Sequence, residues 1–377
     1  MTRLAVTLMA VAWSGAAFAA DPTPAFPEGK HGKGELKHVH GMPVVVVRGT
    51  PAEIGEQLGL LTVKAAPGLD EMHANFLRDA KLEDRSTVLK LMARRLMPNF
   101  PPDHRTEIEA MAKAGGQQLD LALFANTVYD LSSGMGCSTI VVEKARSKTG
   151  APIFGRNFDW RPTKGLTEHT LLAVFHPEGK HAFATVTICP IVGCISGMND
   201  AGLACTINEI HLRQSKDKAR FNWDGTPTLL AFRRVLEECG TVAEAETLLR
   251  GMKRTTSACL TVCDRDGGSV IEVTPKTVVR RSAVNDVCLC TNHLRSEDLS
   301  KGENCWRYTA LEPLQKEDTK LGVADVFAQL HEVNQGKATL QSMVFEPAKR
   351  TLHLKYGAGP ATGLKARTFE LGKWFDQ

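Results

Sequence analysis

The pattern of apolar residues changes at Cys137, and this change divides the fold into two parts. From Thr50 to about Leu131, apolar side chains recur with the period of an α-helix. From Cys137 onward they alternate or form short runs bounded by glycine and proline, which is typical of strands. Helical segments interrupt these strands further on. The sequence therefore predicts an α+β chain with a helical first part.

Capping and turn residues bound the predicted elements. Thr50 followed by Pro51 marks a helix start, because proline is tolerated at the first helical position. Thr241 and Glu244 form a capping box before another helix. Further helices are predicted at 104–113, 121–131, 226–239, 304–314 and 323–333. Strands are predicted at 138–143, 152–158, 170–175, 182–189, 195–198, 203–208, 258–263, 269–273, 287–291, 340–345 and 351–355.

Cys137 follows Gly136 and begins a predicted β-hairpin. The apolar run after Cys137 is joined to a second run by a polar turn around Gly150, and the second strand brings Arg156 and Asp159 back beside the thiol. Cleavage of the Gly136–Cys137 bond would leave an α-amino group on Cys137, which titrates near pH ~8. That amine would be the general base for the thiol of its own residue.

Two plain alternatives to a catalytic site are open at this point. Cysteine is commonly a small buried apolar side chain, and the chain has 10 cysteines. Arg156 and Asp159 would equally be explained by a structural ion pair between strands. The catalytic interpretation depends on further residues downstream.

These downstream residues resemble the N-terminal-nucleophile (Ntn) amide hydrolases, specifically the choloylglycine hydrolase and acyl-CoA:6-aminopenicillanic acid acyltransferase-like group. In that group a cysteine opens the first strand and Arg-x-x-Asp lies on the next, as at Cys137 and residues 155–159. A Gly-Met-Asn segment leading to a second asparagine matches residues 197–208. Thr-Asn at 291–292 and Arg307 match later elements, so the resemblance covers roughly residues 40–360.

The length of chain before the nucleophile separates two branches of this group. In bile-salt hydrolases the cysteine follows the initiator methionine, whereas here more than a hundred residues precede Cys137. The acyltransferase-like branch has this arrangement, cuts its own precursor and keeps both pieces, and residues 47–59 resemble its start. The resemblance therefore implies cleavage between Gly136 and Cys137, with an N-terminal segment of 20–136 and a C-terminal one of 137–377 that stay associated.

The resemblance also implies a fold and a reaction. The fold would be a four-layer αββα sandwich with the nucleophile at the edge of one sheet and a helical N-terminal segment. The sulfur of Cys137 would attack an amide carbonyl while its α-amine takes and later returns the proton. Arg156 would favour the thiolate, because an adjacent cation lowers the pKa of a thiol. Asp159 would accept a hydrogen bond from the α-amine and orient it.

Other residues would bind the substrate or stabilise the transition state. Asn208 is the candidate oxyanion-hole donor, with a structural role in a turn as the alternative. Asn292 would bind near the amine or the scissile amide, and Arg307 would buttress the site or meet a substrate anion. Trp160 and Trp306 are candidates for lining an apolar acyl pocket, with packing in the core or at its lip as the alternative.

Residues 1–19 have the anatomy of a secretory signal peptide. A basic start at Arg3 precedes an apolar stretch at 4–13, and residues 17–19 are Ala-Phe-Ala, which suits cleavage near Ala19 or Ala20. The sequence therefore predicts a secreted or periplasmic protein. In an oxidising compartment some of the other nine cysteines would pair, Cys189 with Cys194 or Cys259 with Cys263.

Composition limits the possible partners. The net charge of +4 and the lack of a long Lys/Arg run argue against nucleic-acid binding. No later apolar run approaches the ~18–20 residues that cross a bilayer. His38, His40, His211 and His293 fit no metal-ligand spacing, so neither a metal nor a cofactor is predicted.

The sequence thus predicts an exported, self-processing cysteine hydrolase that cleaves a linear C–N amide of an N-acyl substrate through an acyl-enzyme on Cys137. An acyltransferase using the same chemistry and an inactive binding protein on the same fold are the alternatives. A papain-like protease is disfavoured, because no Cys-Gly-Ser-Cys-Trp run and no suitably placed histidine accompany the thiol. The substrate is open among N-acyl amino acids, N-acyl amines, acyl-homoserine lactones, bile-salt conjugates and β-lactam side chains.

Overall fold

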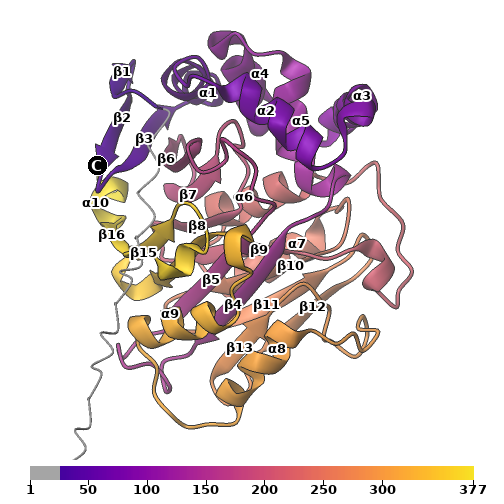
Figure 1. The fold of residues 1–377 in the computed structure, drawn as a ribbon, viewed down its shortest axis with the longest axis vertical. Coiled ribbons are helices and arrows are strands. Elements are labelled where there is room, and N and C mark those ends of the chain that lie inside the picture. The colour runs from indigo at the N-terminus through magenta and orange to yellow at the C-terminus, as the bar shows by residue number, and fades with distance from the viewer. Residues whose placement is uncertain (1–25) are drawn as a thin grey trace, which may run out of the picture.

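Two β-sheets lie face to face in the protein, and helices cover the outer face of each (Figure 1). The computed structural model describes residues 26–377. The predicted signal peptide lies outside the described residues. The α+β fold and the four layers of the predicted αββα sandwich are confirmed.

The larger sheet has ten strands and the smaller has six. In spatial order, the larger sheet is formed by β1 (Gly29–His31), β2 (Gly34–Val39), β3 (Met42–Gly49), β6 (Thr170–Pro177), β7 (Phe183–Ile188), β8 (Ser196–Asn199), β9 (Ala204–Glu209), β10 (Ala258–Cys263), β11 (Gly268–Val273) and β12 (Val278–Ser282). The smaller is formed by β13 (Val287–Cys290), β4 (Gly136–Val142), β5 (Ile153–Asp159), β14 (Thr339–Glu346), β15 (Thr351–Tyr356) and β16 (Arg367–Glu370). All neighbours are antiparallel except β3 and β6, which are parallel.

Ten α-helices are found in residues 26–377. They are α1 (Pro51–Leu58), α2 (Leu69–Asp79), α3 (Ser86–Leu96), α4 (Pro102–Gly115), α5 (Leu119–Leu131), α6 (Thr228–Glu238), α7 (Val242–Gly251), α8 (Trp306–Leu311), α9 (Val323–Glu332) and α10 (Gly372–Phe375). The capping boxes predicted at Thr50 and Thr241 are both present. None of the described helices is long and apolar enough to cross a bilayer.

Alternate residues of each strand face different layers. Along β4, Val141 belongs to the apolar cluster between the two sheets, while Ile140 and Val142 pack under α9 with Val326 and Leu330. The outer face of the larger sheet packs against the N-terminal helices and α6 in a third cluster. Both faces of β4 and β5 are buried, so these strands lack the regular alternation of apolar and polar residues that a half-exposed strand shows.

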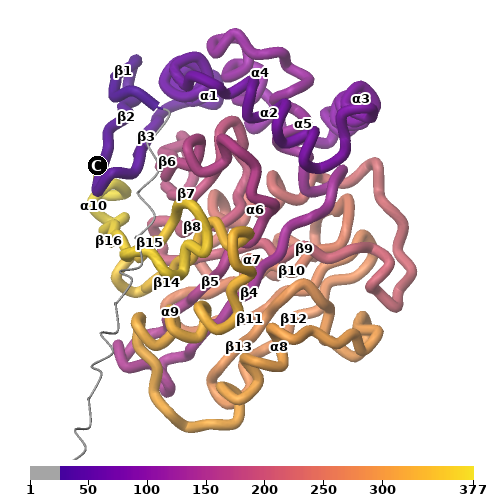
Figure 2. The backbone as a smooth tube through the Cα atoms, viewed as in Figure 1, coloured from indigo at the N-terminus to yellow at the C-terminus, as the bar shows by residue number. Residues whose placement is uncertain are grey.

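The N-terminal segment is mainly helical, as predicted, and it also adds three strands to the larger sheet. Residues 42–49 form β3, which pairs with β6 from the other side of Cys137. Figure 2 shows these N-terminal strands beside the C-terminal end of the chain, where Arg48 donates a hydrogen bond to Gln377. The segments before and after Gly136 therefore share one sheet.

The predicted disulfide pairs are not formed. All ten cysteines are free and buried. Cys259 and Cys263 are four residues apart on β10, a spacing of about 13 Å along an extended strand, which no disulfide can bridge. Cys194 lies instead near Cys205, with 3.6 Å between the two sulfurs.

Candidate active site

The predicted hairpin is formed by β4 and β5, and it places the catalytic candidates together. Cys137 is opposite Phe158, Gly136 is opposite Asp159, and Thr139 is opposite Arg156. The nucleophile was expected at the edge of a sheet, but β4 is an interior strand because β13 pairs with its other side. Cys137 lies near the end of this strand and is 0% exposed.

Arg156 reaches the sulfur of Cys137 directly. Its Nη2 donates to Sγ over 3.1 Å, and its Nη1 donates to the carbonyl oxygen of Ile195 at 2.6 Å and to the hydroxyl of Ser196. The guanidinium carbon also lies 5.0 Å from the centre of the Phe158 ring. These contacts fix the cation beside the thiol.

Two opposing effects act on the thiol of Cys137. Burial raises its pKa above the ordinary value, and the Arg156 cation works in the opposite direction. The predicted effect of Arg156 thus has the expected sign, but burial is the larger influence in the uncleaved chain. The thiol is therefore protonated at neutral pH.

Asn292 and Arg307 hold the backbone of Cys137. The Cys137 N–H donates to Asn292 Oδ1 at 2.8 Å, and Arg307 Nη2 donates to the same oxygen at 2.8 Å. Arg307 Nη1 donates to the Cys137 carbonyl and, over 3.1 Å, to the Ser138 hydroxyl. Asn292 thus lies at the nitrogen of the bond predicted to be cut, and Arg307 donates to the same Asn292 oxygen.

Asp159 is held by two residues that the sequence analysis did not identify. Thr339 donates to its Oδ1 at 2.5 Å, and Gln335 donates to its Oδ2 at 2.8 Å. Arg307 Nη1 lies 3.7 Å from Asp159 Oδ2. No local pattern marks Gln335 or Thr339, which are more than 170 residues from Asp159 in sequence.

Asn208 is buried close to this group, but its amide donor is already used. Its Nδ2 donates to the carbonyl of Thr291 at 3.1 Å. Its Oδ1 is a buried atom with no hydrogen-bond partner among the described residues. A role as oxyanion donor therefore requires the side chain to exchange this bond, and it stays a prediction.

Gly136 has a steric reason for being glycine. A Cβ at this position would collide with Nε2 of Gln335, the side chain that holds Asp159. Two residues earlier, the backbone N–H of Gly134 and that of Met135 donate to Glu209, a further residue missed by the sequence analysis. Its signal was a carboxylate directly after Asn208, at the end of a buried strand.

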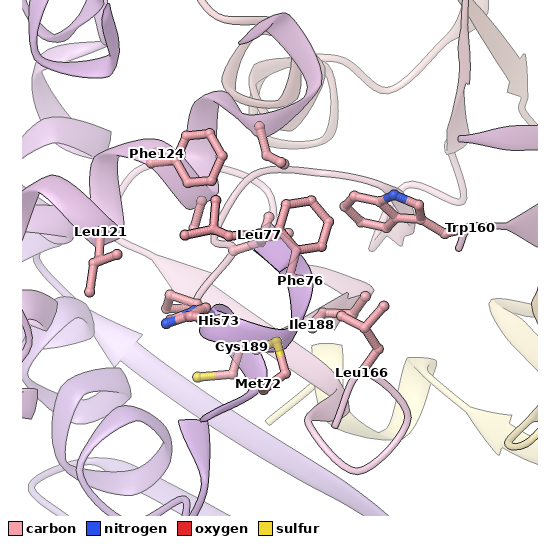
Figure 3. A pocket seen from close by; sticks show the side chains of 14 residues that line it. Met72, His73, Phe76, Leu77, Leu121, Phe124, Trp160, Leu166, Ile188 and Cys189 are labelled. Atoms are coloured by element: carbon pink, nitrogen blue, oxygen red, sulfur yellow. The ribbon is translucent and has the colours of Figure 1, made fainter. Parts of the chain in front are cut away.

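An open apolar pocket lies beside the site. Figure 3 shows Phe76 of α2 next to Trp160, and the two rings meet edge to face at 5.4 Å. Trp160 also contacts Phe158, which is opposite Cys137 in the hairpin. The pocket is further lined by Met72, His73, Leu77, Leu121, Phe124, Ala125, Val128, Leu166, Ile188, Cys189, Pro190 and Ile191.

Trp160 lines this apolar pocket, whereas Trp306 does not. Trp306 is 58% exposed and does not line this pocket. It begins the short helix α8, and the next residue, Arg307, takes the inward direction. Because neighbouring residues of a helix point about 100° apart, the inward turn of Arg307 directs Trp306 to the surface.

No group of three or more candidate ligands for a metal ion occurs in the part of the chain that the structure describes. His293 is not an isolated surface residue, however. It lies near Glu303, with 3.7 Å from Nε2 to Oε2, and near Cys305. Although burial opposes them, hydrogen bonds with His293 and Thr291 lower the pKa of the Cys305 thiol to about 6.

Comparison with known proteins agrees with the motifs. Residues 145–316 match the family of acyl-coenzyme A:6-aminopenicillanic acid acyl-transferase. This range contains every predicted catalytic residue except Cys137, which lies just before it. An uncharacterized protein of Archaeoglobus fulgidus is 26% identical over 144 residues, which cover 37% of this chain and 23% of that protein.

Two solved structures align with part of this chain. The N-acylethanolamine-hydrolyzing acid amidase ortholog of Caenorhabditis elegans aligns with 56% of this chain and 93% of its own, at 20% identity and a TM-score of 0.44. A mutant of conjugated bile acid hydrolase from Clostridium perfringens aligns with 63% of this chain and 93% of its own, at 13% identity and a TM-score of 0.47. The chain is therefore similar to the family of acyl-coenzyme A:6-aminopenicillanic acid acyl-transferase over residues 145–316, the part that carries the motifs from Arg156 to Arg307.

Proposed function

We propose that this protein is an exported, self-processing cysteine hydrolase that cleaves the linear amide bond of an N-acyl substrate with an apolar acyl group. The observation that carries the proposal is the environment of Cys137. Its sulfur accepts a hydrogen bond from Arg156 and its nitrogen donates one to Asn292, at the start of a strand that follows Gly136. A structural cysteine would need no cation at its sulfur.

Self-cleavage would come first. The sulfur of Cys137 attacks the carbonyl carbon of Gly136, the bond from that carbon to the Cys137 nitrogen breaks, and the thiol proton passes to the nitrogen. Water then hydrolyses the resulting thioester, which gives a carboxylate on Gly136 and restores the thiol. The product carries a free α-amine on Cys137, attached to the same Cα as the thiol side chain.

This amine would supply the base that the uncleaved chain lacks. It takes the thiol proton as Cys137 attacks the substrate carbonyl, and returns a proton to the departing amine. Asp159, which faces Gly136 across the hairpin, is placed to orient the new ammonium. The amide of Asn208, after exchanging its bond to Thr291, is the candidate donor for the developing oxyanion.

The apolar pocket would take the acyl group. Its wall continues from Trp160 through Phe158 to the strand pair that carries Cys137. Small-molecule pockets are typically apolar with few polar groups, and an extended hydrocarbon or aromatic acyl chain suits these aromatic and aliphatic walls. An acyltransferase would use the same acyl-enzyme, but acyl-CoA is not readily supplied to an exported enzyme.

The proposal is tested by the intact mass of the purified protein and of its Cys137→Ala variant. We expect two chains from the wild type, the larger beginning at Cys137, and a single chain from the variant. Two fragments from the variant would show that another protease makes the cut. A single wild-type chain that releases no acid from a panel of N-acyl amides would instead favour a binding protein.

A further inference from the structure

The short segment before the predicted cut is held by a buried carboxylate. Glu209 Oε2 accepts hydrogen bonds from the backbone N–H of Gly134 at 3.1 Å and of Met135 at 2.7 Å. On the other side of the segment, Asn292 Nδ2 donates to the carbonyl of Met135 over 3.4 Å. The two residues before Gly136 are therefore fixed through their backbone.

Glu209 is costly to bury, and these contacts account for its position. It is 6% exposed at the end of β9, and burial raises the pKa of its carboxyl. The imidazole of His211 lies beside it, with 3.7 Å from Nε2 to Glu209 Oε1, and that side chain is 59% exposed. A buried carboxylate is stabilised by hydrogen bonds, and the two N–H groups of the segment supply them.

The segment needs such support because it contains two glycines. Gly134 has a φ of 134°, a conformation open to glycine but not to other residues, and glycine loses more backbone freedom on folding than any other residue. Intramolecular attack depends on holding the reacting groups in place, and a displacement of about 1 Å is enough to slow it strongly. A free segment would move the Gly136 carbonyl relative to the sulfur.

We propose that Glu209 is a positioning residue for self-cleavage, which holds residues 134–136 so that the Gly136–Cys137 bond stays beside the thiol. The inference rests on the proposed function and adds that one residue serves self-cleavage rather than the reaction with substrate. Glu209 acts on the segment that is cut, through N–H groups that belong to that segment. It therefore serves the single processing event more than the repeated reaction with substrate.

The test compares Glu209→Gln with wild type and with Glu303→Gln in full-length chains made by cell-free synthesis. Glu303 is a nearby carboxylate that bonds Gln214 and does not touch the segment, so it is the matched control. We expect Glu209→Gln to slow the appearance of the Cys137 fragment by about tenfold or more, the rate equivalent of one hydrogen bond to a charged group. Glu303→Gln should process at the wild-type rate.

A second measurement separates positioning from a purely structural role. Once Glu209→Gln has been cut, its kcat/KM per cleaved molecule should stay within a few-fold of wild type. Processing at the wild-type rate would overturn the proposal, as would an equal loss of turnover and processing. If the variant loses its thermal transition, Met135→Pro removes one of the two donated N–H groups without changing β9, and its processing at the wild-type rate overturns the proposal in the same way.

The failure of the underlying function gives a different result. In that case the wild-type chain stays uncut, like Cys137→Ala, and the Glu209 and Glu303 variants cannot be distinguished from it. A cut wild type with an unaffected Glu209→Gln leaves the hydrolase proposal intact and removes only the role of Glu209.

Discussion

Two charged side chains of the site, those of Arg156 and Asp159, are buried, and each is stabilised there by hydrogen bonds. Arg156 is fully buried, and its charge is met by the sulfur of Cys137, a carbonyl and a hydroxyl instead of a carboxylate. Asp159 is buried as well, and its carboxylate accepts hydrogen bonds from Thr339 and Gln335. The two residues therefore do not form the direct ion pair that was the alternative explanation for them.

Asp159→Asn should impair self-cleavage or turnover by about one to two orders of magnitude, because it removes the charge that orients the amine of Cys137. The fold should persist, since an amide still accepts the hydrogen bond from Thr339. Processing on a denaturing gel and thermal unfolding of the same sample measure the two effects. Gln335→Ala is the milder comparison, and an Asp159→Asn variant that unfolds yet keeps full activity when stabilised would indicate a structural role.

His73 gives a pH-dependent contribution to stability. Burial in the wall of the apolar pocket lowers its pKa to about 4, whereas an unfolded histidine titrates near ~6.5. A depressed pKa stabilises the folded state above the unfolded value, and this contribution is lost as pH falls from about 6.5 towards 4. Lowering the pH from about 7 to about 5 should therefore reduce the unfolding free energy of wild type by on the order of 1–2 kcal/mol more than that of His73→Leu.

Denaturant unfolding of both proteins at the two pH values gives this difference and cancels the titration of all other groups. A difference that does not change with pH would mean that His73 is hydrated in the folded protein and titrates normally.

At the scale of elements, a buried ion network joins α4 to α6. Arg233 on α6 donates to both oxygens of Glu107 on α4, at 2.7 and 2.6 Å, and to Glu237 at 2.8 Å. Glu237 also bonds His104 on α4 at 2.9 Å. Burial raises the pKa of Glu237, but Arg233 and the neighbouring cations outweigh this effect and hold that pKa below its usual range. The network thus links the two sides of the predicted cut.

Arg233→Met should cost about 3–5 kcal/mol of unfolding free energy, because it leaves two buried carboxylates without their main cation. Arg234→Ala is the matched control on the same helix, since Arg234 pairs with Glu238 nearer the surface, and it should cost less than about 1 kcal/mol. Equal losses in the two variants, measured by denaturant unfolding, would show that Arg233 adds nothing beyond helix packing.

At the scale of the whole molecule, the segments on either side of Cys137 form one core. β3 pairs with β6, Tyr129 of α5 donates to the carbonyl of Ser257 at 3.0 Å, and one apolar cluster contains residues of both segments. Separating them would expose the outer face of the larger sheet. The cut is therefore expected to leave the assembly intact.

The processed protein should elute as a single species on size exclusion and resolve into two chains in strong denaturant. No reductant should be needed, because all ten cysteines lie in the chain that begins at Cys137 and none lies in the segment before it. Separation of the fragments in native buffer would contradict the shared core, and a single band on a denaturing gel would show that the chain is not cut.

The local pattern of residues was enough to predict most helices and the hairpin that begins near Cys137. Period, caps and turn residues act within a few positions, so Cys137, Arg156 and Asp159 could be predicted as neighbours from the register of one short hairpin. Contacts between distant parts of the chain could not be predicted in this way. Which strands and helices pack together decides the hydrogen bonds from Gln335 to Asp159 and from Met135 to Glu209. The same packing decides that the amide of Asn208 is occupied, that Trp306 is exposed and that the cysteines are unpaired. Met135 and Glu209 are separated by 74 positions in sequence, and Asp159 and Gln335 by 176. No short-range pattern encodes contacts across such separations.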